Sequence, residues 1–344
     1  MKQRLFIIGL VMSMLLTGCS YTVPPEEKTS DIQNSENPFE EDTGSNVIGE
    51  ISHGPLDISW SEDGDILPFE YNGGEFSLKY HFSVMGKAES VGFLLFLNGE
   101  PQPYKVDNTA ELSYCHSFPM KDSIEQDITF IFTPIAGNKG DTLNLTVLSL
   151  YYPTFQPDME TTSSYGFYQG ILQYHVPIDF HVDAPVDSQP EDLIADIVTG
   201  LDIREEKFTK EFLESELPAN GVFDTTAIER TPYFTIAYDG TLKLDNFNLT
   251  GKDTVTIRYK LCGPEGSKYN TIFYLDHQPI SYDHVIAYET TLAKGGVWVA
   301  EMTIDVSKLP DFSTFYVISV PADGNRDSMA IKTTSILFYK EKQL

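Results

Sequence analysis

Two Asp-His pairs are the residues in this sequence best suited to binding a metal ion or moving a proton. Asp276-His277 and Asp283-His284 lie on the two sides of a short turn sequence. A chain that folds back there could bring two imidazoles and two carboxylates together. The matching places of a repeated hairpin hold Asn98-Gly99 and Lys105-Val106, so the module folds without those groups. We therefore interpret both pairs as solvated turn residues and predict neither a metal site nor a cofactor.

A further group of histidine and aspartate lies in the first half of the chain. His175, Asp179 and His181 share one face of a stretch in which apolar and polar residues alternate. The two histidines are six residues apart, which corresponds to about 20 Å at the rise of a β-strand. These side chains therefore cannot bind one ion together.

Motifs of hydrolases and phosphate-binding enzymes are absent, including Gly-x-Ser-x-Gly, His-Glu-x-x-His and a Gly-rich phosphate loop. Cys115 and Cys262 have no evident histidine partner and stand at different places of the repeat, so they indicate no disulfide framework. With 51 acidic residues in the chain, neighbouring carboxylates say nothing about acid-base catalysis. We predict that the protein is not an enzyme.

Aromatic residues gather in one stretch that is otherwise rich in Pro, Gly, Ser and Thr: Tyr151, Tyr152, Phe155, Tyr165, Phe167 and Tyr168. Two interpretations remain open. The rings fold back onto the domain, or they form an exposed surface that stacks on a sugar or contacts a protein partner. In the second case the candidate binding residues are Tyr165, Phe167 and Tyr168.

The start of the chain has the pattern of an export signal. Lys2 and Arg4 precede an apolar run from Leu5 to Leu16, too short to cross a bilayer but typical of a secretory signal. The following Leu16-Thr17-Gly18-Cys19 resembles the lipobox of bacterial lipoproteins. The resemblance implies a lipid on Cys19, removal of residues 1–18, and retention at the extracytoplasmic face of the cell membrane, or at an outer membrane in a diderm source.

The charge of the chain restricts its partners. The formal net charge is −28 and becomes −30 when Lys2 and Arg4 are removed with the signal. Nucleic acid is excluded because its binding requires a basic surface. Residues 19–50 are acidic and poor in large apolar side chains, so we predict a disordered tether. Such a chain reaches on the order of 30 Å from the membrane.

A repeated hairpin predicts the fold. Asn98-Gly99 and Asp276-His277 each separate two strand-like runs, and the residues of a type I′ turn need positive φ. The preceding strands also repeat, since Phe76 to Phe82 alternates in the same way as Val255 to Leu261. A third correspondence pairs Pro134 to Lys139 with Pro321 to Arg326.

Short strands at regular spacing with turn residues between them favour an all-β fold. We predict two tandem antiparallel sandwiches, at residues 51–184 and 230–344, that resemble immunoglobulin-like or fibronectin-like domains in architecture. The central Trp and paired Cys of antibody domains are missing. Leu172 to Val182 alternates strictly and contains Pro177, which predicts an added edge strand found only in the first sandwich.

Residues 185–229 are expected to form a small α-helical spacer between the sandwiches. One helix is predicted by Pro190 near its start, by apolar Leu193, Ile194, Ile197 and Val198, and by Gly200 just after it. The spacing of Phe208, Phe212, Leu213 and Leu217 before Pro218 predicts a second helix.

These features favour a membrane-anchored binding or scaffolding component of the bacterial cell envelope, with an envelope protein or a glycan as partner. The alternative is a carbohydrate- or solute-capture lipoprotein that works with a transporter.

Overall fold

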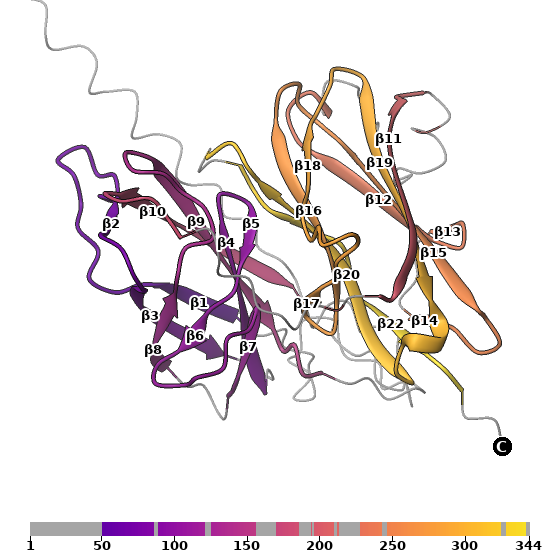
Figure 1. Ribbon diagram of the computed structural model, residues 1–344, viewed down its shortest axis with the longest axis horizontal. Coiled ribbons are helices and arrows are strands. Elements are labelled where there is room, and N and C mark those ends of the chain that lie inside the picture. The colour runs from indigo at the N-terminus through magenta and orange to yellow at the C-terminus, as the bar shows by residue number, and fades with distance from the viewer. Residues whose placement is uncertain are drawn as a thin grey trace, which may run out of the picture. The chain divides into compact units, whose positions relative to one another are not determined.

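The computed structural model describes residues 50–85, 89–120, 125–155, 170–185, 194, 196–209, 212, 228–242, 246–324 and 328–341. The predicted signal peptide, Cys19 and residues 20–49 of the tether lie outside these ranges, as do Tyr165, Phe167 and Tyr168. The named elements are β-strands and one 3-10 helix, η2 (Val306–Lys308), so the all-β prediction is confirmed (Figure 1). In the described ranges no helix is long and apolar enough to cross a bilayer.

The first sandwich consists of two sheets that enclose an apolar core. We call its two sheets outer and inner, the inner one being the sheet that faces the second sandwich. The outer sheet has the strand order β1 (Glu50–Pro55), β3 (Phe76–Met85), β8 (Glu125–Phe132), β6 (Lys105–Val106). Its inner sheet has the order β2 (Phe69–Tyr71), β10 (Ile171–Phe180), β9 (Thr142–Tyr151), β4 (Ser90–Leu97), β5 (Glu100–Gln102), with β7 (Cys115–Pro119) also paired to β4. The ring of Phe93 lies in the middle of this core and contacts five other aromatic rings.

The second sandwich repeats this plan. Its outer sheet has the order β11 (Val198–Lys207), β19 (Gly296–Asp305), β15 (Thr254–Cys262), β12 (Tyr233–Tyr238), β13 (Thr241–Leu242). Its inner sheet has the order β14 (Asn246–Asn248), β22 (Ile336–Tyr339), β20 (Phe312–Pro321), β16 (Lys268–Leu275), β17 (Gln278–Pro279), with β18 (Tyr288–Thr291) on β16 and β21 (Ile331–Lys332) on β20. Two sandwiches with equivalent pairings confirm the predicted fold class.

The two repeated hairpins have the predicted turn conformation. Asn98 and Gly99 have φ of 50° and 85°, and Asp276 and His277 have φ of 48° and 66°. The first turn joins β4 to β5 and the second joins β16 to β17. The hairpins therefore fix which residues of the two sandwiches correspond.

This correspondence corrects the prediction of an added strand. β10 pairs antiparallel with β9 and parallel with β2, and β22 pairs in the same way with β20 and β14. The second sandwich thus has its own version of β10, divided into β21 and β22. β2 flanks β10 only from Ile178 onward, so Pro177 lies on the open part of the strand, where a missing N–H donor costs no ladder bond.

The third sequence correspondence was wrong. Pro134 to Lys139 connects β8 to β9, whereas Pro321 ends β20, the counterpart of β9. The true counterpart of the β8–β9 connection is the segment around η2. Both loops contain Pro and Gly because each is a turn, and this shared composition produced the false match.

The first helix of the predicted spacer is wrong where the structure describes it. Val198 begins β11, which pairs with β19 along its whole length. Ile194, predicted in the same helix, forms a bridge with Ile280 and packs against the second core. This part of residues 185–229 therefore belongs to the second sandwich. Of the second predicted helix, Phe212 is helical and its ring contacts that of Phe208, whereas Leu213 and Leu217 lie outside the described ranges.

The inner strands are buried on both faces. β3 alternates buried and more exposed residues, as expected for a strand with one face in water, whereas all eight residues of β4 are buried. β9, β16 and β20 likewise are buried over most of their lengths. A strand without alternation has apolar neighbours on both sides. The second neighbour is the inner sheet of the other sandwich.

Candidate binding surfaces

The two sandwiches meet in a continuous apolar contact between their inner sheets, which we call the joint. Its buried core contains Leu94, Phe96, Leu148, Leu150, Ile272, Tyr274, Tyr316, Ile318, Val320 and Ala330. Leu94 pairs with Leu148 in the first sandwich as Ile272 pairs with Ile318 in the second. Equivalent residues thus supply both sides, as in an isologous dimer. Together with residues 47–344 forming one compact unit, this makes the sandwiches one body.

Each repeated hairpin turn touches the opposite sandwich. A Cβ atom on Gly99 would lie 3.0 Å from the Pro321 carbonyl oxygen and 3.2 Å from Ala322 Cβ. In the equivalent turn, His277 Nε2 lies 2.9 Å from the Pro153 carbonyl oxygen of the first sandwich. Gly99 therefore lets the first turn approach the second sandwich closely, and His277 joins the second turn to the first sandwich by a hydrogen bond.

The environment of His277 favours the neutral imidazole. Nε2 donates to the Pro153 carbonyl, which leaves Nδ1 to accept from the Tyr316 hydroxyl at 3.1 Å. Burial lowers the pKa of His277 to about 4, and the nearby Lys332 acts in the same direction. A protonated ring would donate from both nitrogens, so the Tyr316 hydroxyl would have to turn and accept at Nδ1. The joint thus contains a histidine whose charging opposes the contact.

Polar side chains also cross the joint. Gln173 accepts from the Ala330 backbone N–H at 2.7 Å and lies 3.4 Å from the Ser328 carbonyl. Gln278 donates to the Ser113 hydroxyl at 3.2 Å. These bonds fix the relative position of the sheets more closely than apolar packing alone, because their geometry is directional.

His53, in β1, is held as a neutral imidazole inside the first sandwich in the same way as His277 is in the joint. Nε2 donates to the Leu172 carbonyl at 3.1 Å, and Nδ1 lies 2.6 Å from the Tyr80 hydroxyl. Burial lowers the pKa of His53 to about 4. The sequence analysis did not single out this residue, since a lone His in an edge strand gives no local signal.

The Asp-His pairs behave as predicted turn residues. Asp276 accepts from the Thr314 backbone N–H at 2.7 Å, and Asp283 and His284 have positive φ between the bridged Tyr282 and Val285. His277 is the exception, because it is half-buried in the joint and both of its ring nitrogens are hydrogen-bonded.

The histidines of β10 do not converge. His175 lies 2.8 Å from the Asn144 amide, the Asp179 carboxylate accepts from Thr142, and His181 lies 3.9 Å from Glu70. Among the described residues no group of three or more His, Cys, Asp or Glu side chains could hold a metal ion. Cys115 and Cys262 are free thiols, and burial raises the pKa of each to about 12.

The first half of the aromatic stretch folds back onto the protein. Tyr151 is buried in the first core, Tyr152 packs against that core, and the rings of Tyr152 and Phe155 lie 5.3 Å apart. Pro153 supplies the carbonyl that His277 binds. The candidate binding residues Tyr165, Phe167 and Tyr168 lie outside the described residues, so their role stays a prediction.

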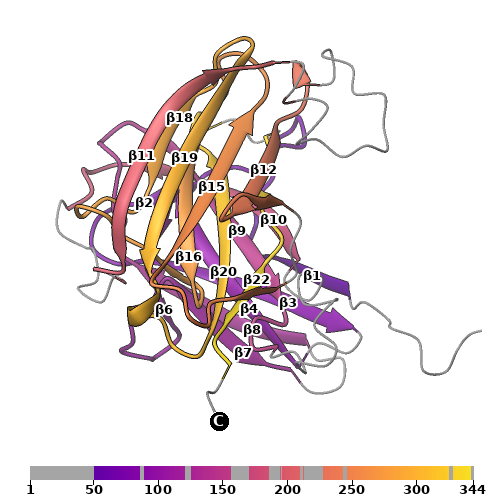
Figure 2. The ribbon, with the colours of Figure 1, turned by 90° about the vertical axis from the view of Figure 1, so that its right-hand side faces the viewer.

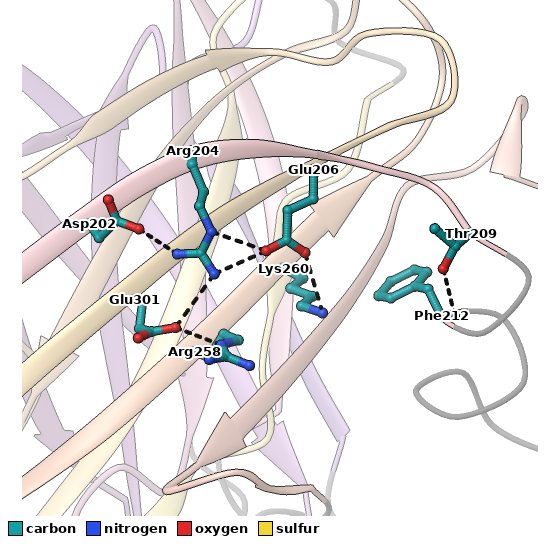
Figure 3. A network of polar contacts seen from close by, with 8 residues as sticks. All are labelled: Asp202, Arg204, Glu206, Thr209, Phe212, Arg258, Lys260 and Glu301. Atoms are coloured by element: carbon teal, nitrogen blue, oxygen red, sulfur yellow. Dashed lines mark hydrogen bonds and ion pairs between the residues drawn. The ribbon is translucent and has the colours of Figure 1, made fainter.

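A network of charged side chains covers part of the outer sheet of the second sandwich (Figure 3). Arg204 of β11 contacts Asp202, Glu206 at 3.0 Å and Glu301 at 3.6 Å. Glu301 also binds Arg258 of β15 at 2.7 Å. The hydrogen bonds that Arg204 donates to Asp202 and Glu206 raise the pKa of Arg204, so its positive charge is permanent.

An apolar patch lies beside this network on the same sheet. Phe212 and Ile228 pack with Cys262, Val297 and Val299. The Lys260 ammonium lies 5.1 Å from the centre of the Phe212 ring, a cation–π contact. The described residues between β11 and β12 therefore cover part of this sheet, which is a different role from the spacer that the sequence suggested.

Trp60 is a candidate contact residue that the sequence analysis missed. It lies in a small hairpin between β1 and β2, where Trp60 bridges Ile66 and Gly64 turns the chain with φ of 87°. Its side chain is 60% exposed, and Leu67 nearby is 44% exposed. Trp298, by contrast, is buried. An exposed Trp on a loop is a common contact for a sugar ring or a protein partner.

No family model and no curated protein matches this chain. Among solved structures it is similar to the fibronectin(III)-like modules of Clostridium thermocellum CbhA, with 10% identity, 84% of this chain and 94% of that chain covered, and a TM-score of 0.20. It is also similar to the N-terminal Ig1-2 module of the Drosophila receptor protein tyrosine phosphatase DLAR, with 10% identity, coverage of 86% and 99%, and a TM-score of 0.23.

A third similar structure is the C-terminal domain of the Streptococcus agalactiae AgI/II polypeptide BspA, with 10% identity, coverage of 84% and 100%, and a TM-score of 0.19. At these scores the similarities carry no inference about family or function.

Proposed function

We propose that the protein is an extracytoplasmic lipoprotein that serves as a binding or scaffolding component of the bacterial cell envelope, anchored through a lipid on Cys19. The observation that carries this proposal is the joint, whose buried core fixes the two sandwiches as one body. A scaffold requires its contact loops and sheet edges to keep a constant spacing. The joint provides this without a disulfide, since both described cysteines are free.

The anchor is tested by replacing Cys19. We expect Cys19→Ala to lose metabolic palmitate labelling and to keep residues 1–18, because the thiol is both the acylated atom and the cleavage marker of a lipobox. Cys115→Ala is the matched control, since Cys115 lies in β7 of the folded part, and it should remain labelled. Labelling of the Cys19→Ala chain would contradict the proposal.

The partner surface is tested at Tyr165, Phe167 and Tyr168, changed together to Ser. If these rings form a binding surface, proteins captured by cross-linking in intact cells should be lost while the melting temperature is unchanged. Changing Trp60 to Ser gives a comparison at a second exposed aromatic position. Unchanged capture with a large fall in melting temperature would show that the three rings stabilise the fold.

Carbohydrate capture is a second candidate function, and the exposed Trp60 is the observation that favours it. Stacking of a sugar on an indole changes the fluorescence of that indole. A saturable change in fluorescence with cell-wall oligosaccharides, absent in Trp60→Phe, would support capture. Trp298 is the only other tryptophan and is buried, so any signal left in Trp60→Phe measures the background.

A further inference from the structure

The longest edge strand of the second sandwich has an open side. β11 has ten residues and forms the margin of its outer sheet, where it pairs with β19 (Figure 2). In the described ranges no strand pairs with its other side. The same margin of the outer sheet in the first sandwich holds β6, which pairs with β8 over two residues. A long edge presents backbone groups that another strand can pair with, whereas a short edge does not.

The side chains of β11 do not protect this edge against a copy of itself. Edge strands are often guarded by charged side chains, which oppose another strand where charges of the same sign meet. The outer face of β11 carries Asp202, Arg204 and Glu206, whose charges alternate in sign. Ile203 in the middle of the strand is 42% exposed. An exposed Ile between charges of opposite sign is suited to an antiparallel partner of the same sequence.

Charge selects one register for such a pair. When two β11 strands run antiparallel with their outer faces on the same side, centring them on Ile203 places Asp202 of each copy opposite Arg204 of the other. Centring on Asp202, Arg204 or Glu205 places that residue opposite its own copy, so like charges meet. Directly opposed charges stabilise a strand pair when unlike and destabilise it when like. Asp202 is 66% exposed and Arg204 35% exposed, so both side chains are accessible.

We propose that two copies of this chain associate through β11, antiparallel about Ile203, so that their outer sheets form one continuous sheet. Each copy of Arg204 then contacts Asp202 of the second copy in addition to its own neighbours, which the five donors of a guanidinium permit. The two Ile203 side chains meet on the axis and leave water. This association goes beyond the proposed envelope function and does not depend on the lipid anchor.

Cysteine cross-linking tests the register in membranes that contain the full chain. Ile203→Cys should give a covalent dimer on oxidation, because the two sulfur atoms face each other across the axis. Glu205→Cys on the same strand should give much less, since Glu205 faces Leu201 of the second copy. Ser77→Cys on exposed β3 of the first sandwich controls for random collision. Equal cross-linking at the three positions, none at 203, or cross-linking of 203 to a different protein would overturn the proposal.

Charge reversal gives an independent test. Arg204→Asp places like charges opposite each other and should weaken dimerisation of the detergent-extracted chain at least tenfold in sedimentation velocity. The double change Asp202→Arg with Arg204→Asp restores unlike pairs in the same register and should restore the dimer. Circular dichroism of each variant checks that the monomer remains folded, since Arg204 also binds Glu206 and Glu301. A folded double variant that stays monomeric would refute the register.

Discussion

Acid should destabilise this protein through the buried His53 and the half-buried His277, and the contribution of His277 is measurable. The folded-state pKa of His277 is about 4, against 6.5 for an unperturbed histidine. The unfolded chain therefore binds the proton more readily than the folded chain between these values. The stability from the neutral ring is complete above pH 6.5 and is lost as the pH falls from 6.5 to 4. The shift corresponds to roughly 3 kcal/mol of unfolding free energy.

The measurement compares urea unfolding of the wild type and His277→Asn at several pH values between 7 and 4. Asn tolerates the positive φ of this turn position. His53 has the same pKa shift, so the wild type should lose up to about twice the amount that a single histidine contributes. The His277→Asn variant should lose only the part of this unfolding free energy that comes from His53. Buried carboxyl groups titrate equally in both proteins, so the difference between the two curves isolates His277.

The refuting result is a parallel pair of curves. If the unfolding free energies of wild type and His277→Asn fall equally between pH 6.5 and 4, His277 is not held neutral in the joint. His53→Gln is the internal control, because it should remove an equal share through the first sandwich without touching the joint. Amide exchange of β9 and β20 distinguishes the two, since only protonation of His277 should open the joint first.

Three further outcomes are expected. Gly240→Ala should lower the unfolding free energy by about 1–2 kcal/mol, because φ is 80° and nothing lies within 4 Å of the added Cβ. In the same urea titration, Gly99→Ala should lower the unfolding free energy by at least about 1 kcal/mol more, because its Cβ meets the second sandwich. Leu148→Ala should lower the unfolding free energy by about 2–5 kcal/mol, since Leu148 is fully buried in the joint. Cys115 and Cys262 should resist iodoacetamide at pH 8 until denaturant is added, because burial raises both pKa values to about 12; labelling at equal rates in folded and unfolded protein would contradict this.

The fold class could be predicted because the local signals agree with the tertiary structure. The alternating strand from Phe76 onward and the turn at Asn98-Gly99 have the predicted conformations. The sequence also contains a signal for the joint. Val91 to Leu97 is apolar without alternation, and a strand of that kind requires a second apolar neighbour. What the pattern does not identify is which surface provides that neighbour.

The prediction of the first helix failed because competing patterns overlap at β11. Ile194, Ile197 and Val198 have helical spacing, whereas Leu201 and Ile203 alternate with charged residues as in a strand. Pairing with β19 decides in favour of the strand, and this contact is distant in sequence. Tertiary pairing of this kind overrides a weak local propensity. The candidate binding residues could be proposed from composition only, since no spacing rule connects aromatic loop residues to a partner.

Specific differences within a symmetric joint disfavour pairing of the first sandwich's inner sheet with a copy of itself. Equivalent apolar residues on both sides would allow either sandwich to pair with its own kind. Gly99 faces Ala322, and in a pair of first sandwiches it would instead face Tyr152, the residue at the equivalent place. The bond from His277 to Pro153 would also be absent from such a pair. One crowded contact and one lost hydrogen bond disfavour the wrong partner, while the shared apolar core supplies most of the attraction.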